Sequence, residues 1–267
     1  AASGDLGNDV SGNGNDWTKV GTITQTATSP TNIAATMDPL VNSNVAYSDG
    51  NRTITAGSGG DETSYSTIVI PNTGKWYWEM VATNAYGLMG IVSTGYVGPP
   101  AVAYKNAIGG GGAPYADEAL IFRDSGIKRR TEGGSTTADT TFGSAWSSGD
   151  VIQCAFDAGA GKIWWGIDNT WQASGDPAAG SNEAYGSIPF EMSPNTYRVI
   201  TNRAGGDPVS TFAFADADFA HTPPTGFLSL TTNNLPEQSG NIDDHFKTVL
   251  YTGTGSSLAV TGVGFQP

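Results

Sequence analysis

Short runs in which apolar and polar residues alternate cover much of the chain, and glycine-rich turns separate them. The clearest pair is Val151 to Asp157 (VIQCAFD) and Lys162 to Ile167 (KIWWGI), both rich in β-branched and aromatic residues. The Ala158 to Gly161 segment between them contains two glycines, which can adopt the positive φ of a tight reversal. The pattern therefore predicts a β-hairpin. Its adjacent Trp164 and Trp165 should point to opposite faces, one into a core and one toward a second surface.

A second β pattern runs over residues 74–83 (GKWYWEMVAT) and continues in 87–94 (GLMGIVST). Alternation places Trp76, Trp78, Met80 and Ala82 on one face and Tyr77, Glu79 and Val81 on the other. Glu79 then lies among apolar neighbours, and a buried carboxylate requires partners. A structural acid bonded to backbone amides or to an arginine is favoured over a catalytic one.

The rest of the chain repeats this pattern with shorter runs. Asp49-Gly50 and Asp124-Ser125-Gly126 are expected to be hairpin turns. Residues 1–16 and 96–117 have the glycine-rich composition of loops, and no stretch of ten residues shows a capped amphipathic helical period. The pattern predicts an all-β sandwich, with further strands at 20–26, 45–47, 52–55, 119–123, 126–131, 197–201, 209–214, 246–251 and 258–263.

Composition narrows the classes of function. Charged residues are only 14% of the chain, the formal net charge is -13, and Lys128-Arg129-Arg130 is the only basic run, interpreted as a solvated strand end. Binding of nucleic acid requires a positive footprint, so this class is excluded. No apolar run approaches the ~18 residues that span a bilayer, so no membrane insertion is expected. Cys154 stands alone in an apolar strand pattern, which indicates a buried structural thiol.

Both ends of the sequence differ from its centre. Residues 1–17 form a predicted linker, 18–236 the sandwich with its core at 45–227, and 237–267 a C-terminal linker and hairpin that could begin another domain. Oxygen-bearing side chains in the first linker could hold a calcium ion, with Asp5, Asn8 and Asp9 as candidate ligands. The spacing matches no twelve-residue calcium loop, and the same residues are ordinary in turns. No other cofactor is expected.

Signatures of catalysis are absent from the sequence. No Gly-x-Ser-x-Gly elbow occurs, and the only histidines are His221 and His245, too few for a usual zinc site. With 25 acidic residues in the chain, the pair of carboxylates that a glycosidase needs stays an open alternative, but no motif indicates such a pair. The prediction is therefore that the chain is not an enzyme.

Aromatic residues in the predicted loops are the best candidates for contact with a ligand. Such side chains grip sugars or protein side chains by stacking and desolvation, although at least half of them are expected to cap the core instead. The Tyr96 to Tyr115 and Asn169 to Asp176 loops are the expected contact surface. The predicted contact residues are Tyr96, Tyr104, Tyr115, Asn169, Trp171 and Asp176, and Trp146 is a further aromatic of this kind.

Several motifs of the chain, in order, resemble those of the SPRY domain. They are GKWYWE at 74–79, Gly90-Ile91, GDVI at 149–152 with Phe156-Asp157, GKIWW at 161–165, and Asn169. The resemblance covers roughly residues 45–227 and departs from the family at Thr170, where glycine commonly follows the asparagine. It implies a SPRY-like bent antiparallel β-sandwich, of concanavalin-like jelly-roll architecture, whose edge loops bind protein partners without catalysis.

A narrower resemblance is to SPRY-like segments of tailed-phage tail-fibre-type structural proteins. It is carried by NTW at 169–171 with SGDP at 174–177, DFAHTPPTGF at 218–227 and NLP at 234–236. It implies an extracellular virion module, in a fibre or a surface decoration, that binds other virion proteins or a host-surface glycan or protein, often as a homo-oligomer. A protein-interaction module of a cellular surface protein and a glycan depolymerase are the alternatives.

Overall fold

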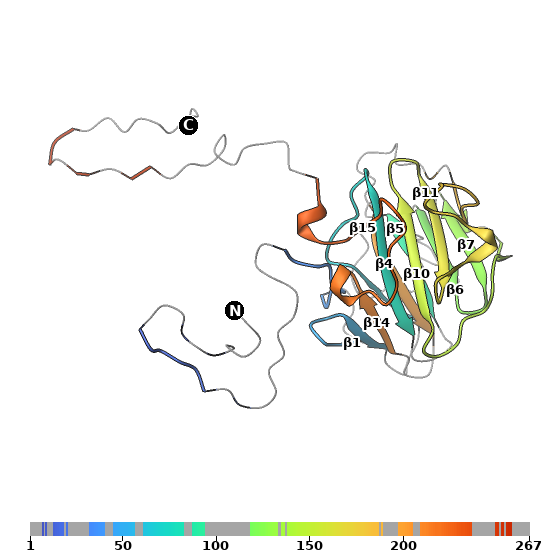
Figure 1. Ribbon diagram of the computed structural model, residues 1–267, viewed down its shortest axis with the longest axis horizontal. Helices are drawn as coiled ribbons and strands as arrows, with labels where there is room; N and C mark the ends of the chain where they lie inside the picture. Colours follow the sequence, from blue (N-terminus) through green and yellow to red (C-terminus); the bar gives the residue numbers. More distant parts are fainter. Residues whose placement is uncertain are drawn as a thin grey trace. The chain divides into compact units, whose positions relative to one another are not determined.

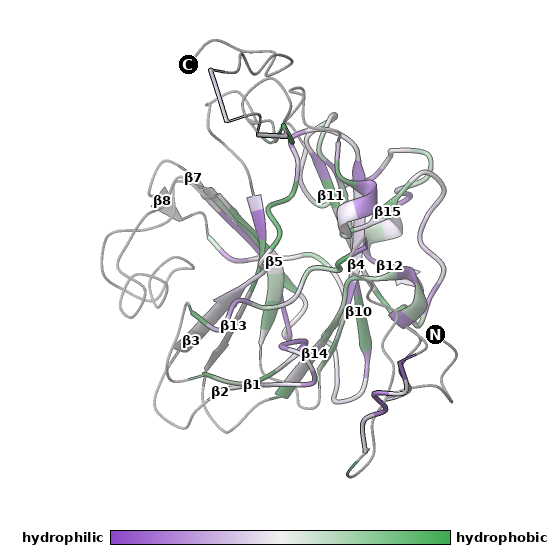
Figure 2. Cartoon of the chain, turned by 90° about the vertical axis from the view of Figure 1, so that its left-hand side faces the viewer, coloured by the Kyte–Doolittle hydropathy of each residue, from purple (hydrophilic) through white to green (hydrophobic). Residues whose placement is uncertain are grey.

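A computed structural model gives the fold. It describes residues 7, 9, 13–18, 20, 32–40, 45–56, 61–82, 87–93, 118–132, 135, 136, 138–186, 188, 197–204, 209–236, 249, 250, 252, 253 and 255–257. The chain divides into two compact units, Ala1–Asn234 and Leu235–Pro267. Nearly all the described secondary structure lies in the first unit, where two antiparallel sheets face each other (Figures 1 and 2). The predicted all-β sandwich is confirmed.

The first sheet has eight strands in the order β1-β2-β14-β4-β10-β11-β12, with β15 pairing in parallel with β4. Its strand β14 comes from late in the chain but lies between β2 and β4. The strands are β1 (Val45–Ser48), β2 (Thr53–Ala56), β4 (Lys75–Ala82), β10 (Val151–Asp157), β11 (Lys162–Ile167), β12 (Thr170–Trp171), β14 (Val209–Ala213) and β15 (Leu228–Ser229).

The second sheet has seven strands in the order β3-β13-β5-β6-β7-β8, with β9 pairing with β7. The strands are β3 (Asp61–Tyr65), β5 (Leu88–Ser93), β6 (Glu118–Arg123), β7 (Ile127–Glu132), β8 (Ser135–Thr136), β9 (Thr140–Thr141) and β13 (Tyr197–Ala204). The described helices are three short 3-10 turns, η1 (Gln172–Ser174), η2 (Asp216–Asp218) and η3 (Thr232–Asn234). No helix among the described residues is long and apolar enough to span a bilayer.

The two tryptophans of β11 face opposite sides, as predicted. Trp165 stacks on Phe122 of the other sheet at 5.8 Å between ring centroids, so its side of the first sheet is the inner one. Cys154 lies directly opposite Trp165 in the ladder and shares this inner face. It is fully buried, and this burial raises the pKa of its thiol well above the ordinary value against a smaller opposing effect of Trp165. The interpretation of Cys154 as a buried structural thiol is confirmed.

Trp164 belongs to a second apolar cluster, on the outer face of the first sheet. It packs there with Tyr77, Ala155 and Phe227, all at most 6% exposed. Residues after β14 cover this face, because Phe227 meets Trp164 edge to face and Phe219 meets Tyr77 in the same way. The eight-stranded sheet is therefore covered on both sides, which explains why β10 and β11 are buried almost throughout.

A segment at 32–38, called the strap here, ties the ends of the first unit together. Ile33 N–H donates to Thr232 Oγ1, and Ala35 N–H donates to Leu230 O. Farther along, Met37 forms a bridge with Ser66 beside β3. The strap thus connects the C-terminal part of the unit to the edges of both sheets.

Both predicted turns are confirmed, whereas other interpretations need correction. Strand β3 (DETSY) was not predicted from the sequence. Thr170–Trp171 was expected to be in a loop but pairs with β11 as β12. Trp146 was a candidate contact residue in a loop but is buried against Phe122. Of the predicted strands 20–26, 246–251 and 258–263, only residues 20, 249 and 250 are described, and none of these lies in a strand.

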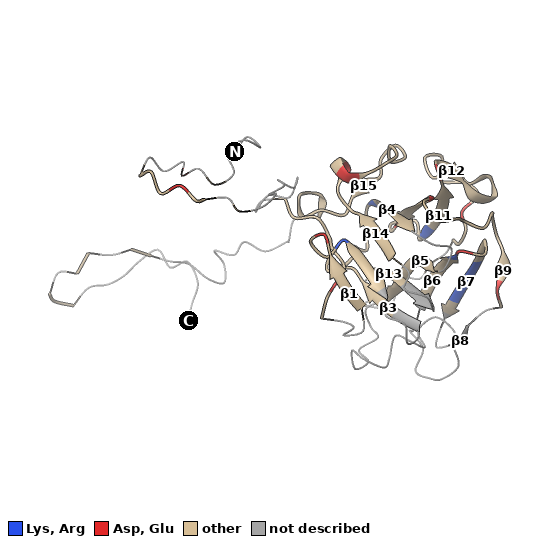
Figure 3. Ribbon diagram, turned by 90° about the horizontal axis from the view of Figure 1, so that it is seen from below, with Lys and Arg blue, Asp and Glu red and all other residues tan. Residues whose placement is uncertain are grey.

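The basic run is also not a solvated strand end, because it lies within β7 (Figure 3). The Lys128 ammonium donates to Ala184 O and lies 4.6 Å from the Tyr185 ring and 5.0 Å from the Phe142 ring. Burial lowers the pKa of Lys128. Arg129 pairs with Asp139. These cations are therefore part of the packing of the second sheet's edge.

Candidate functional site

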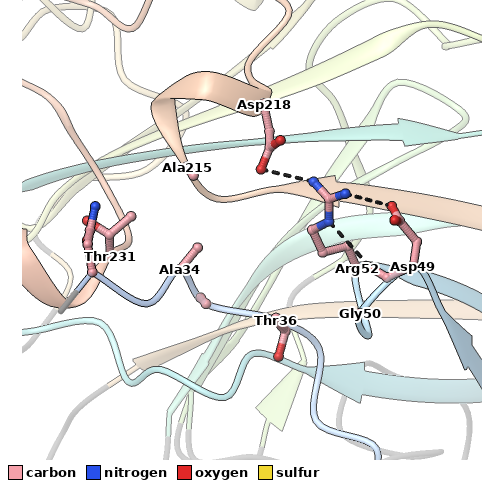
Figure 4. Close-up of a pocket in the computed structure, with 10 residues that line it drawn as sticks. Ala34, Thr36, Asp49, Gly50, Arg52, Ala215, Asp218 and Thr231 are labelled. Carbon is pink, nitrogen blue, oxygen red and sulfur yellow. Dashed lines mark hydrogen bonds and ion pairs between the residues drawn. The ribbon is translucent and has the colours of Figure 1, made fainter. Parts of the chain in front are cut away.

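The candidate site is a groove on the outer face of the eight-stranded sheet, which we call the Arg52 groove. It consists of two adjoining hollows of about 160 and 210 Å³ that share Asp49, Arg52 and Asp218 in their linings. The first hollow lies against the strap and is shown in Figure 4. The second lies over the sheet and adds Glu79, Val81, Thr211, Phe212, Ala213 and Ala220.

The turn between β1 and β2 presents Arg52 to the groove. Asp49, Gly50 and Asn51 all have φ between 51° and 64°, a left-handed conformation that these three residue types tolerate best. This tight turn brings the Asp49 carboxylate back over Arg52. The Arg52 Nη2 to Asp49 Oδ2 distance is 2.9 Å.

A second carboxylate reaches Arg52 from the other end of the chain. The Arg52 Nη1 to Asp218 Oδ2 distance is also 2.9 Å, so the guanidinium lies between two carboxylates (Figure 4). Its side chain is 25% exposed. Desolvation opposes its charge, but the hydrogen bonds and charges of Asp49 and Asp218 outweigh this effect and raise the pKa of Arg52. Arg52 is thus a permanently charged and well-oriented group.

Glu79 fixes the loop that carries Asp218. Its carboxylate is 2% exposed and accepts hydrogen bonds from Ala220 N–H at 2.6 Å and His221 N–H at 2.9 Å. The Tyr77 hydroxyl donates a third bond, at 2.6 Å. The interpretation of Glu79 as a structural acid bonded to backbone amides is confirmed.

Further buried polar groups extend this network across the sheet. Gln153 Nε2 donates to the Tyr77 hydroxyl, and Gln153 Oε1 accepts from Asn169 N–H. Gly166 lies opposite Gln153, where a Cβ would come 3.1 Å from Gln153 Oε1. Burial, and then the bond to Glu79, raises the pKa of Tyr77 far above its ordinary value, so Tyr77 stays a neutral donor. A continuous chain of hydrogen bonds therefore links the β11–β12 turn to the loop beside Arg52.

Three predicted contact residues lie in described segments, and none of them lines the groove. Asn169 has a φ of 63° in the two-residue turn between β11 and β12, a conformation typical of asparagine. Trp171 is half-buried against the outer apolar cluster. Asp176 is exposed, and its carboxylate accepts from Ala179 N–H. All three belong to the segment 169–176 that follows β11.

The remaining predicted site residues fall largely outside the described part. Tyr96, Tyr104, Tyr115, Asp5 and Asn8 are not described. Asp9 is described, where its N–H donates to Asp16 Oδ1 and its Oδ2 accepts from Asn15 N–H. Within the described ranges, no three His, Cys, Asp or Glu residues come together as a metal site. Calcium binding stays a prediction.

The sequence pattern did not reveal the Arg52 groove. Asp49-Gly50 was correctly predicted to be a turn, and Asp218 lies in a segment that carried the narrower resemblance. Nothing in either segment indicates that the two meet at Arg52, because they are distant in the chain. The one available sequence signal was Glu79, whose burial required a partner.

Comparisons with known proteins give structural likenesses only. No protein-family model and no curated protein sequence matches the chain. The SPRY domain of human HERC1 is similar at 14% identity and a TM-score of 0.45, over 66% of this chain and 96% of that one. The TRIM65 PSpry domain is similar at 11% identity and 0.45, over 68% and 90%. Stonustoxin is similar at 13% and 0.45, over 67% of this chain and 28% of that one.

These similar structures include SPRY domains, the type of sandwich that the sequence motifs resemble. Likenesses at this level of identity and superposition do not indicate a partner or an activity for this chain. The resemblance to phage tail-fibre-type proteins stays a prediction.

Proposed function

We propose that the chain is a non-catalytic binding module that holds a protein partner in the Arg52 groove. The supporting observation is that Asp49, Arg52 and Asp218 converge in the lining that the two hollows share. Binding sites are typically concave, largely preformed and equipped with a few oriented polar groups. Here the hydrogen bonds from the Ala220 and His221 N–H groups to Glu79 hold one wall of the groove in place.

The bonding of three described acids supports a role without catalysis. A general acid or base needs a carboxylate that can reach a substrate proton. Glu79 is already saturated by three donors. Asp157 accepts from Ala160 N–H and pairs with Lys75, and Asp168 accepts from Val151 N–H. These carboxylates maintain turns and sheet contacts.

The finer proposal is that this module belongs to a virion, outside the cell, and contacts a host-surface protein or neighbouring virion subunits. It rests on the motifs at 169–177, 218–227 and 234–236. A homo-oligomer and the Tyr96 to Tyr115 loop as a further contact belong to the same proposal. The genomic neighbourhood tests it: genes for other virion proteins are expected beside this gene, and a locus of cellular surface proteins would contradict it.

Selection from a random peptide library tests the binding function. Ala213 lines the groove on the outer side of β14, so Ala213→Trp should fill the second hollow without changing charge. We expect peptides selected on the unmodified protein to lose measurable binding to Ala213→Trp. Ala138→Trp, at an exposed residue away from the groove lining, serves as the matched control and should bind normally.

The outcome that overturns the proposal is specific. If folded Ala213→Trp, checked by its circular dichroism spectrum and melting temperature, retains the affinity of the unmodified protein for every selected peptide, the Arg52 groove is not the binding site.

A further inference from the structure

The charges around the Arg52 groove are unbalanced. Three carboxylates, those of Asp49, Glu79 and Asp218, line it together with the single guanidinium of Arg52. Glu79 is buried and fully bonded, whereas the side chains of Asp49 and Asp218 are 51% and 33% exposed. An excess of negative charge is therefore present at the mouth of the groove.

Each exposed carboxylate keeps bonding capacity. Asp49 and Asp218 both direct Oδ2 toward Arg52, and among the described residues neither Oδ1 has a hydrogen bond. A carboxylate oxygen can only accept, so a ligand group at this mouth must donate. A partner carboxylate would meet the two aspartates and would have to displace one of them from Arg52.

The walls suit an aliphatic stem. Ala34, Ala35 and Ala215 line the first hollow, and Val81 and Ala213 line the second. Lysine and arginine bury their methylene stems along apolar surface while the charged head stays among polar groups. The whole chain carries a formal net charge of -13, which favours the approach of a basic partner.

We propose that the Arg52 groove takes a lysine or arginine side chain of the protein partner. This rests on the proposed binding function and adds the chemistry that the groove selects. The cationic head lies against the outer oxygens of Asp49 and Asp218, and its stem lies along the alanine-lined wall. Arg52 holds the two carboxylates apart and in place.

A titration followed by amide chemical shifts in NMR tests this inference. The probe is end-blocked trilysine, with end-blocked triglutamate and a neutral oligosaccharide as comparisons. We expect trilysine alone to shift the amides of Gly50, Ala213 and Ala220, and to do so less as salt is added, because salt screens exposed charges.

Paired variants identify the acceptors. The double variant Asp49→Asn with Asp218→Asn should weaken trilysine binding by about tenfold, the expected sum of two partly exposed charge contacts. Asp216→Asn removes an exposed carboxylate from the same 3-10 turn without touching the groove and should leave the affinity unchanged. Unchanged amide shifts elsewhere in the sandwich verify that each variant is folded.

The two experiments together distinguish a wrong ligand from a wrong binding site. If the oligosaccharide or triglutamate shifts the groove amides and trilysine does not, the cationic ligand is wrong, although Ala213→Trp still abolishes peptide binding. Equal trilysine affinities for the double variant and Asp216→Asn would likewise overturn it. If Ala213→Trp leaves peptide binding intact, the groove itself is the wrong site.

Discussion

Among single residues, Glu79 connects the sheet to the loop that carries Asp218. Its carboxylate bonds to backbone 141 and 142 residues later in the chain. Burial of a charged group is unfavourable unless hydrogen bonds replace its water, and here three donors do so. The position of Asp218 beside Arg52 therefore depends on a residue that a ligand need not touch.

Substitution of Glu79 should be costly. Glu79→Ala leaves the Tyr77 hydroxyl and two backbone N–H groups without their acceptor. The buried Tyr77 hydroxyl alone should cost about 1 to 3 kcal/mol, and the two part-buried N–H groups, which water can reach, should add less. Glu79→Gln keeps one acceptor oxygen and should lose less. Urea denaturation measures both, with Asp216→Asn as an exposed control expected within about 0.5 kcal/mol of the unmodified protein. A loss below 1 kcal/mol for Glu79→Ala would show that the network does not support the fold.

At the scale of the elements, hairpin turns set the register of the strands. The β6–β7 turn contains Gly126 at a φ of 76°, and the β1–β2 turn contains Gly50 at 64°. Both need the left-handed region, but their surroundings differ. A Cβ on Gly126 would come 2.4 Å from Gly143 O, whereas one on Gly50 would meet nothing within 4 Å.

These two glycines form a matched pair for mutagenesis. Gly50→Ala should destabilise the protein by about 1 to 2 kcal/mol, the cost of the left-handed conformation alone. Gly126→Ala adds a clash with backbone that cannot move aside easily, so its loss should exceed that of Gly50→Ala by at least about 1 kcal/mol. Melting temperatures and urea midpoints measure the difference. Equal losses would indicate that the β6–β7 turn relaxes freely.

The elements that could be predicted are those whose own residues carry the pattern. β4, β10 and β11 have apolar residues at strand spacing, and their turns contain glycine, aspartate or asparagine. β3 could not be predicted in this way, because its buried Thr63 and Ser64 are polar and its strand conformation follows from pairing with β13. The groove escaped prediction for a related reason. Its charged residues meet only after the sheet is assembled, and no local pattern records that contact.

At the scale of the whole molecule, the first unit is closed by contacts between its distant ends. Ile33 in the strap bonds to Thr232, 199 residues later. Phe227 and Leu230 are both at most 6% exposed. In the chain they follow the loop that carries Asp218 and precede Thr232. Residues 226–232 therefore belong to the sandwich as much as its long strands do.

Truncation tests this assignment. A chain that ends at Pro236 keeps the strap contacts and every described strand of the first unit, and it should melt within about 2 °C of the full chain. A chain that ends at Gly226 loses Phe227, Leu230 and Thr232, and the removal of two buried side chains alone should lower the melting temperature by at least about 10 °C. Similar melting temperatures for the two truncated chains would contradict the role given to residues 226–232.

The place of β14 between β2 and β4 has a consequence for synthesis on the ribosome. Until residues 209–213 have emerged, the β1–β2 hairpin has no strand that joins it to β4, and both neighbours expose unpaired edges. Such late, long-range pairings fold slowly and leave a nascent chain open to association with other chains. Asp218 follows β14, so the Arg52 groove is completed among the last features of the fold. Only a fully synthesised and closed sandwich can offer that groove to a partner.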